Sequence, residues 1–219
     1  MKNTQFAVIG LGRFGMSLIN ELSRMGYDVL AIDNDEEKVQ DAAETATHAV
    51  QADAMDEQAL KSVGIRNFDV VVVAIGENIQ TNILSTIILK EMGVKTVVAK
   101  ARNALHGKVL EKIGADLVIY PERDMAVKLA RSLVSRNILE HIELSPDYSI
   151  IELITPKDFI GKSLVDLGVR QKMGVTILAI RHSDEIIVAP RASQIIHPGD
   201  VLVALGKNAD LQRLGEMES

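Results

Sequence analysis

Three glycines near the start of the chain have the spacing of a phosphate-binding loop. Gly10, Gly12 and Gly15 form the pattern G-x-G-x-x-G, which follows a short apolar run and precedes a helical pattern. In that context Gly10 permits a tight turn, Gly12 lets the backbone approach a pyrophosphate, and Gly15 lets the helix pack close to a sheet. The N–H groups at the start of the helix would then face the phosphates. A glycine turn that holds no ligand is the alternative.

Two aspartates end expected strands at the same carboxyl edge of the sheet as the glycine loop. Asp33 ends the second strand, where a carboxylate accepts hydrogen bonds from ribose hydroxyls. A 2′-phosphate there would meet a like charge, so the sequence disfavours NADP as a ligand. Asp53 ends the third strand and could bond an adenine amino group or a ribose. Capping of the next helix is the alternative for both residues.

Four further charged residues fall near this edge. Arg13, inside the glycine loop, could reach a phosphate with its guanidinium or remain solvated. Lys100 and Arg102 lie just past the fifth strand, where contact with a phosphate and ordinary surface charge are both open. Glu122 follows Pro121 at the start of a long helix. Its carboxylate either favours the helix dipole or lies near a triphosphate that carries a bound cation.

An alternation of strands and helices over the first two-thirds of the chain must position these residues. Short apolar runs, as expected of strands buried on both faces, alternate with helical patterns that end at glycine. Six strands joined by crossover helices predict an α/β fold, a Rossmann-like doubly wound parallel sheet. The expected strands cover residues 6–9, 29–32, 48–53, 70–75, 96–99 and 117–120. The helix directly after the glycine loop carries Phe14, Leu18, Leu22 and Met25 at helical spacing and ends before Gly26. The later helices are expected at residues 35–45, 55–63, 78–92, 103–113 and 121–139.

Two of these helices show an apolar stripe that should face inward. In helix 78–92 the stripe consists of Ile79, Ile83, Ile87 and Ile88. In helix 121–139 the stripe consists of Met125, Leu129, Leu133 and Val134.

The pattern changes near Ser145, Pro146 and Asp147, beyond which turn residues are frequent and strands dominate. The expected strands there are 150–154, 174–180, 185–188 and 200–205, with short helices at 161–167 and 209–214. The sequence therefore predicts two domains. Residues 1–140 form the nucleotide-binding domain, and residues 141–219 form a small α+β module.

Composition excludes several classes of protein. The chain has 219 residues, a net charge of −6, no cysteine, no tryptophan and 3% aromatic residues. An acidic chain disfavours nucleic-acid binding, and the lack of cysteine excludes thiol catalysis and thiolate zinc sites. Residues 1–5 lead into an apolar run too short for a signal peptide, and the stretch 70–75 is far below a span of about 20 residues. A membrane role would therefore come through a partner.

No catalytic constellation is visible in the sequence. None of the three tyrosines has a lysine four residues on, and the five histidines show no metal-binding spacing. Residues 182–184 indicate a hairpin loop and residues 197–200 a turn. A nucleotide site without chemistry favours a sensor over an enzyme. An NAD-dependent oxidoreductase or epimerase, or a repressor-like nucleotide-binding module, are the alternatives.

Several segments in register resemble RCK-type, or KTN, regulatory subunits of Ktr-type bacterial potassium uptake systems, and they are similar also to Trk peripheral subunits. The resemblance spans essentially the whole chain. It rests on residues 6–15 (FAVIGLGRFG), 33, 47–50, 72–80 and 109–116, and on residues 166–170 and 176–180 of the second module.

This resemblance implies a cytoplasmic ring, usually of eight subunits, on the inner face of the membrane. The ring binds ATP, ADP and sometimes NAD(H), and it gates a membrane potassium-translocating subunit. The glycines would hold phosphates and Asp33 the ribose. Arg13 would approach the γ-phosphate from a neighbouring subunit, and Glu122 would hold Mg²⁺ or another cation beside ATP. The remaining residues of the implied nucleotide site are Phe14, Asp53, Ile75, Gly76 and Lys100.

The second module of this family pairs into dimers, and in some members the dimer cleft binds cyclic di-AMP. By this resemblance Arg170 would contact a phosphate, and Leu164, Val175 and Pro190 would form apolar walls. Thr176 stands where relatives often carry asparagine. Core and dimer packing is the alternative for all five residues.

Overall fold

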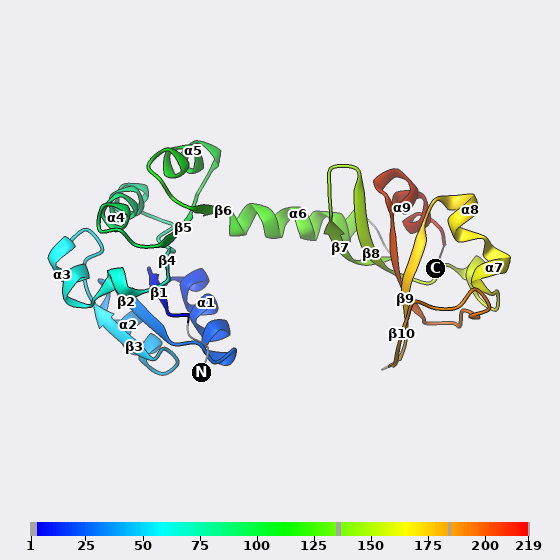
Figure 1. The fold of residues 1–219 in the computed structure, drawn as a ribbon, viewed down its shortest axis with the longest axis horizontal. Coiled ribbons are helices and arrows are strands. Elements are labelled where there is room, and N and C mark those ends of the chain that lie inside the picture. The colour runs from blue at the N-terminus through cyan, green and yellow to red at the C-terminus, as the bar shows by residue number, and fades with distance from the viewer. Residues whose placement is uncertain (1–3, 135–136, 184, 219) are drawn as a thin grey trace. The chain divides into compact units, whose positions relative to one another are not determined.

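The structure is a computed structural model that describes residues 4–134, 137–183 and 185–218 (Figure 1). The chain divides into two compact units, Met1–Arg123 and Asp124–Ser219. Each unit has its own sheet and its own hydrophobic core.

The first unit is built on a six-stranded parallel sheet, which confirms the predicted fold class. Its strand order is β3-β2-β1-β4-β5-β6. The direction of winding therefore reverses between β1 and β4, and ligands of open α/β sheets bind at such a point. The strands are β1 (Phe6–Ile9), β2 (Val29–Asp33), β3 (His48–Gln51), β4 (Val70–Val73), β5 (Thr96–Lys100) and β6 (Leu117–Ile119).

Side chains of each central strand alternate between two cores, one on each face of this sheet. Ala7 and Ile9 of β1 join the core with Leu60 and Leu89, whereas Val8 joins the core with Ile19. Helices on both faces thus cover the continuous apolar runs that the sequence showed. These helices are α1 (Arg13–Arg24), α2 (Glu36–Ala43), α3 (Glu57–Ser62), α4 (Ile79–Glu91) and α5 (Ala104–Lys112). A short 3₁₀ helix, η1 (Ile65–Asn67), precedes β4.

The buried face of α4 differs from the prediction. Its fully buried side chains are Asn82, Ser85, Thr86 and Leu89, and the four isoleucines are only half-buried. Because the apolar residues of α4 are spread around the helix rather than gathered on one face, its hydrophobic pattern could not identify the inner face. Two of the buried polar residues bond within the helix, since Ser85 donates to the carbonyl of Thr81 and Thr86 to that of Asn82.

The second unit contains a five-stranded antiparallel sheet with the order β10-β9-β11-β8-β7. Ile151 and Leu153 alternate inward along β8 and pack with Leu211 and Leu214 of α9. The strands are β7 (Ile138–Glu143), β8 (Tyr148–Ile154), β9 (Thr176–His182), β10 (Glu185–Val188) and β11 (Val201–Lys207). The helices are α6 (Pro121–Val134), η2 (Lys157–Phe159), α7 (Leu164–Leu167), α8 (Val169–Met173) and α9 (Asn208–Gly215).

The long helix ends earlier than predicted. Its described residues reach Val134, and the chain from Ile138 onward is strand β7, which the sequence analysis missed. Ile138 pairs with Leu153 of β8, and after an irregularity in the register Glu140 and Ile142 pair with Glu152 and Ile150. The helical stripe is also corrected, because Met125, Leu129 and Leu133 are exposed within the chain. The fourth member of that stripe, at position 134, has a side chain outside the described residues.

The boundary between the units falls inside α6, whereas the prediction divided the chain at residues 140 and 141. Most of α6 belongs to the second unit, where Lys128 forms an ion pair of 2.8 Å with Glu140 of β7. The region near residue 161 also differs. Ser163 caps α7 in a capping box with Asp166, so the helix begins at Leu164, and the following short helix α8 was not predicted.

Candidate functional site

The glycine loop lies between β1 and α1, where only glycine fits at two of its three positions. Gly10 has a φ of +97°, and a Cβ there would lie 2.9 Å from both the backbone nitrogen and Cγ1 of Ile75. A Cβ on Gly15 would overlap the carbonyl oxygen of Gly10. Gly12 is different, since nothing lies within 4 Å of the position its Cβ would take. The open side of the loop is therefore at Gly12, as a cradle for a pyrophosphate requires.

Helix α1 begins at this loop without a side-chain cap. Its N-cap residue is Gly12, whereas Asp35, Asp56, Asn78 and Asn103 cap the next four helices with their side chains. The first N–H groups of a helix need acceptors, and phosphate oxygens supply them where no side chain does. The start of α1 is thus suited to an anion.

Asp33 joins β2 to the glycine loop. One carboxylate oxygen accepts from the backbone N–H of Leu11 at 2.7 Å, and the other accepts from the N–H of Asp35 at 3.0 Å. The helix cap is Asp35, so Asp33 is not the cap that the alternative interpretation required. Each oxygen keeps a further lone pair for a hydroxyl donor. Asp33 therefore fixes the position of the loop and can still accept a hydrogen bond from a ribose hydroxyl.

Lys38, which the sequence analysis missed, lies beside Asp33. The negative charge of Asp33 is the largest cause that raises the pKa of Lys38, followed by a hydrogen bond with Asp35. The sequence did offer a signal for this residue, because the i, i+3 spacing of Asp35 and Lys38 favours an ion pair on one face of a helix.

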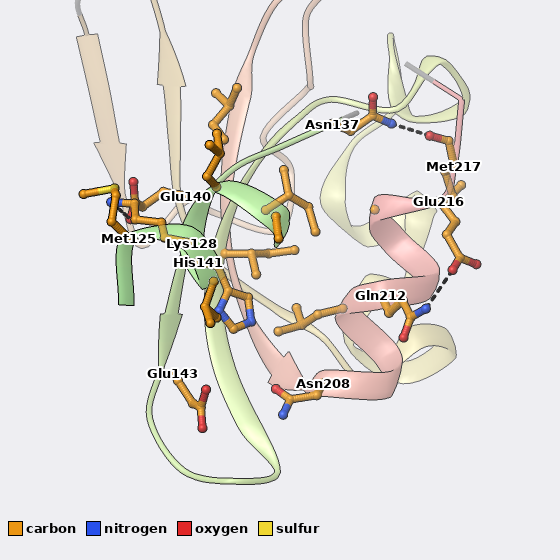
Figure 2. A pocket seen from close by; sticks show the side chains of 18 of the residues that line it. Met125, Lys128, Asn137, Glu140, His141, Glu143, Asn208, Gln212, Glu216 and Met217 are labelled. Carbon is orange, nitrogen blue, oxygen red and sulfur yellow. Dashed lines mark hydrogen bonds and ion pairs between the residues drawn. The ribbon is translucent and has the colours of Figure 1, made fainter. Parts of the chain in front are cut away.

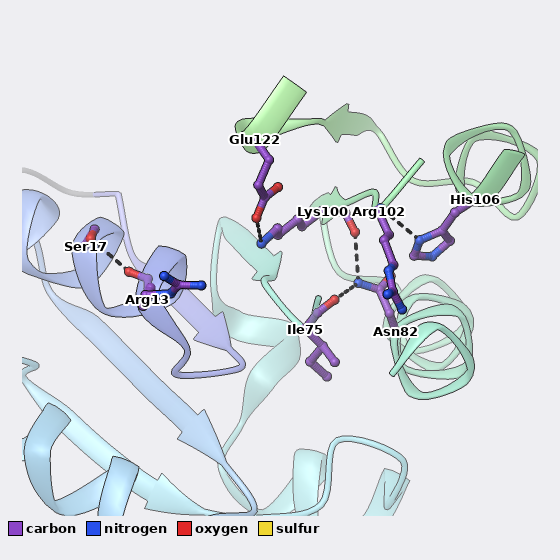
Figure 3. Close-up of polar contacts among 8 residues, drawn as sticks. All are labelled: Arg13, Ser17, Ile75, Asn82, Lys100, Arg102, His106 and Glu122. Carbon is purple, nitrogen blue, oxygen red and sulfur yellow. Dashed lines mark hydrogen bonds and ion pairs between the residues drawn. The ribbon is translucent and has the colours of Figure 1, made fainter. Parts of the chain in front are cut away.

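A second group of predicted residues gathers around Lys100 (Figure 3). The Lys100 Nζ lies 2.6 Å from an oxygen of Glu122 and 5.6 Å from the centre of the Phe14 ring. A Cβ on Gly76 would lie 3.2 Å from the same nitrogen. The lysine side chain is 11% exposed and the glutamate 71% exposed, so the ammonium is enclosed and its partner faces solvent. The structure thus brings together four residues from separate elements.

Charges around Glu122 favour its ionised form. The hydrogen bond from Lys100 is the largest cause that lowers the pKa of Glu122, and the charge of Arg13 also lowers it. Arg13 stands exposed in the first turn of α1, and Figure 3 shows Arg13, Lys100 and Glu122 coming from three elements. The sequence-predicted phosphate contacts and the predicted cation ligand therefore share one electrostatic environment.

Asn82 is a positioning residue that the sequence analysis missed. Its Nδ2 donates to the carbonyl of Ile75 at 2.6 Å and to the carbonyl of Lys100 at 3.1 Å, and the side chain is fully buried. It therefore joins the end of β4 to the end of β5. No signal in the sequence marked it, because Asn82 is one of several polar residues on this helix.

Asp53 is exposed and remains separate from this group. Its carboxylate accepts from the N–H of Met55 at 2.9 Å, which closes a short turn, and Asp56 caps the following helix. The helix-cap alternative for Asp53 is corrected accordingly. Its contact with adenine stays a prediction.

A small cavity of about 250 Å³ lies next to Glu122 and is bordered by Arg102, Tyr120 and Arg123. The Arg123 guanidinium stacks 3.8 Å from the centre of the Tyr120 ring. Behind the cavity, the buried His106 accepts from the N–H of Arg102 through Nδ1, and its Nε2 is buried without a hydrogen-bond partner.

His106 should make stability depend on pH. Burial lowers the pKa of His106, so the unfolded chain takes up this proton more readily than the folded chain. The free energy of unfolding should therefore fall as pH drops below about 6.5, the ordinary histidine value, and level off below the folded pKa. Urea unfolding between pH 7.5 and 5 tests this. His106→Gln should flatten the slope, and the exposed His48→Gln should not; equal slopes in all three chains would contradict the assignment.

The second unit carries a larger groove of about 1230 Å³ between α6, β7 and α9 (Figure 2). None of the predicted ligand residues of this unit borders it. Arg170 is exposed, and Leu164, Thr176 and Pro190 are half-buried. Val175 is 0% exposed and packs in the core, which accounts for it without a ligand. The cyclic di-AMP site stays a prediction.

No three His, Cys, Asp or Glu side chains converge as a metal-ligand group in residues 4–134, 137–183 and 185–218. In the same part of the chain, every helix is too short or too polar to cross a membrane.

Comparison with known proteins matches both units to domain families. The TrkA-N domain family matches residues 6–121, and the TrkA-C domain family matches residues 149–217. Ktr system potassium uptake protein A of Bacillus subtilis (strain 168) is 53% identical over 213 residues, which cover 97% of this chain and 96% of the relative. Ktr system potassium uptake protein C of the same strain is 50% identical over 209 residues, 95% of either chain.

Part of the chain is also similar to a protein of known structure. The crystal structure of GsuK bound to ADP matches with a TM-score of 0.52 and 26% identity. The match covers 59% of this chain and 34% of that chain.

Proposed function

The chain belongs to the family of Ktr-type potassium uptake proteins built from a TrkA-N and a TrkA-C domain, and we propose that it is a nucleotide-sensing regulatory subunit of a potassium uptake transporter. It acts by binding rather than by catalysis. The two Bacillus relatives are potassium uptake proteins, and they lend no support to the oxidoreductase or epimerase alternative.

The single observation that carries this proposal is the fit between the glycine cradle and an adenine nucleotide. The loop is closed at Gly10 and Gly15 but open at Gly12, and α1 starts there without a side-chain cap. These backbone N–H groups would hold the phosphates, and Asp33 would hold the ribose. The similar GsuK structure contains ADP, which supports an adenine nucleotide as the ligand.

Lys100, Glu122 and Arg13 would receive the outer phosphates. Lys100 is a nearly buried cation held by the exposed Glu122, so an arriving phosphate competes with a carboxylate for the same ammonium. Mg²⁺ takes one or two carboxylates and completes its shell with phosphate oxygens and water. In this proposal Glu122 is the ligand that the chain supplies to such an ion. ATP differs from ADP by its γ-phosphate, which is the phosphate that Lys100, Glu122 and Arg13 would contact.

We further propose that the chain assembles into a ring, usually of eight subunits, in the cytoplasm beneath a membrane potassium-translocating subunit. ATP and ADP would favour different shapes of that ring. A ligand shifts such an equilibrium only by its difference in affinity for the two shapes, so the contacts of the third phosphate set the size of the effect. NAD(H) could occupy the same cradle through its pyrophosphate and ribose.

Calorimetric titration of the purified chain with ATP, ADP, NADH and adenosine tests the proposal. We expect ATP and ADP to bind, and we expect Lys100→Met to weaken ATP at least tenfold while adenosine is unchanged. Lys95→Met is the matched control, because Lys95 lies at the opposite end of β5 and is 76% exposed. Binding of NADH alone, or an unchanged ATP affinity in Lys100→Met, would overturn the nucleotide switch. Light scattering on the same samples should give a mass near eight times 23.9 kDa.

A further inference from the structure

Two histidines that are distant in the sequence lie side by side on the second unit. The rings of His182 and His197 are 5.5 Å apart between centres and inclined by 63°. Both residues are exposed. Antiparallel pairing of β9 with β11 places Arg181 opposite Val201, so His182 follows this pair on β9 and the turn of residues 197–200 precedes it on β11.

A buried carboxylate lies under this pair. Asp200 is 1% exposed, and one of its oxygens is 2.6 Å from Nδ1 of His182. Its other oxygen accepts from the backbone N–H of His197 at 2.8 Å. Because the carboxylate occupies Nδ1, the Nε2 of His182 is the ring nitrogen left to face outward as an electron-pair donor. The same carboxylate thus orients one ring and anchors the backbone of the other.

The backbone around the pair is preorganised. His197, Pro198, Gly199 and Asp200 form a turn, which the sequence predicted, closed by a bond of 3.2 Å from the N–H of Asp200 to the carbonyl of His197. Gly199 has a φ of +82°, as a type II turn with proline in its second position requires. Little conformational entropy would remain to be lost when a ligand bound here.

We propose that His182 and His197, oriented by Asp200, form a binding site for a divalent transition-metal ion of the class that prefers imidazole, such as Zn²⁺, Ni²⁺ or Cu²⁺. Two imidazoles that share a tetrahedral ion at about 2.0–2.1 Å have ring centres about 5 Å apart, close to the observed spacing. A carboxylate behind a ligating histidine fixes its tautomer and raises its basicity.

The described residues limit the strength of this site. Since no three His, Cys, Asp or Glu side chains converge there, the ion has two protein ligands and completes its coordination with water. Glu185 stands directly opposite His182 in the β9–β10 ladder, on the same face of the sheet, and adds a negative charge that favours a dication. Hard cations such as Mg²⁺ prefer oxygen ligands and should bind poorly.

Titration of the untagged full chain with Zn²⁺ and Ni²⁺ at pH 7.5, followed by calorimetry, tests the proposal. We expect one equivalent of metal per chain, at least tenfold weaker binding in both His182→Gln and His197→Gln, and an unchanged isotherm in the exposed control His48→Gln. Asp200→Asn should weaken binding about 10- to 100-fold, as removal of an outer-shell carboxylate does. Mg²⁺ should give no heat that the histidine variants remove.

A second readout separates ligation from folding. Paramagnetic Ni²⁺ should broaden the ring proton signals of His182 and His197 and spare those of His48, while Lys100→Met should leave the metal titration unchanged. The site is absent if His182→Gln, an exposed substitution, binds as tightly as the parent chain. It is equally absent if His48→Gln loses the same affinity, or if no signal broadens up to millimolar metal. These outcomes are independent of nucleotide binding, so the two proposals fail separately.

Discussion

Gly15→Ala should abolish measurable nucleotide binding and lower the free energy of unfolding by about 1–3 kcal/mol, the usual cost of overpacking. The added Cβ would overlap the carbonyl oxygen of Gly10, so α1 must move away from β1 or the loop must open. Either movement displaces the N–H groups that the phosphates need. Urea unfolding and calorimetry with ATP measure the two effects.

Gly12→Ala is the matched control for this result. The new methyl group meets no atom within 4 Å, and the backbone φ of −71° suits alanine, so the stability should stay close to that of the parent chain. ATP affinity should still fall at least tenfold, because the methyl group would stand between the backbone and the pyrophosphate. Full ATP affinity in Gly12→Ala would show that the loop is not the phosphate site. Full affinity in Gly15→Ala would contradict the close packing of α1 on the loop.

Asp33→Ala should weaken ATP, ADP and NADH alike by at least tenfold, since the ribose is common to all three ligands. The substitution also removes the acceptor of the Leu11 and Asp35 N–H groups, whose loss should cost about 1–3 kcal/mol of stability. The pKa of Lys38 should return toward its ordinary value, because Asp33 is the largest cause of its rise. Calorimetry and urea unfolding measure these changes.

Asp53→Asn provides the comparison for the second carboxylate at this edge. Asparagine keeps an oxygen that can accept from the N–H of Met55, so stability should not change. A loss of affinity in Asp53→Asn would assign this residue to the nucleotide as well. Retained affinity for all three nucleotides in Asp33→Ala would remove Asp33 from the ribose site. Loss confined to ATP would place Asp33 at the outer phosphate instead.

The parallel sheet could be predicted because its local signals agree with one another. Continuous apolar runs such as residues 70–73 suit strands buried on both faces, and glycines such as Gly26 and Gly93, both with positive φ, end the helices. β7 was missed because residues 138–142 fit the end of a helical stripe as well as an alternating strand. Only pairing with β8 decides between the two.

Residues of the site were predictable where a loop or a strand end dictated them. Gly10 and Gly15 lie where the backbone leaves no room for a Cβ, and Asp33 bonds the backbone of the loop. The G-x-G-x-x-G motif with an acidic residue at the end of the second strand reflects these local constraints. Asn82 could not be found, since its two acceptors, the carbonyls of Ile75 and Lys100, are 7 and 18 residues away. His182 and His197 carry no sequence signal, because the register of β9 and β11 brings them together.

Helix α6 belongs to both units of the chain, because the boundary between the units falls after its third residue, Arg123. Its second residue, Glu122, forms an ion pair with Lys100 of the first unit, while Asp124 and the residues that follow belong to the second unit. Under the proposed function, a phosphate that displaced Glu122 from Lys100 would release the first turn of a helix whose remaining residues belong to the other unit. The ligand would then act on the second unit through the continuous backbone of one helix.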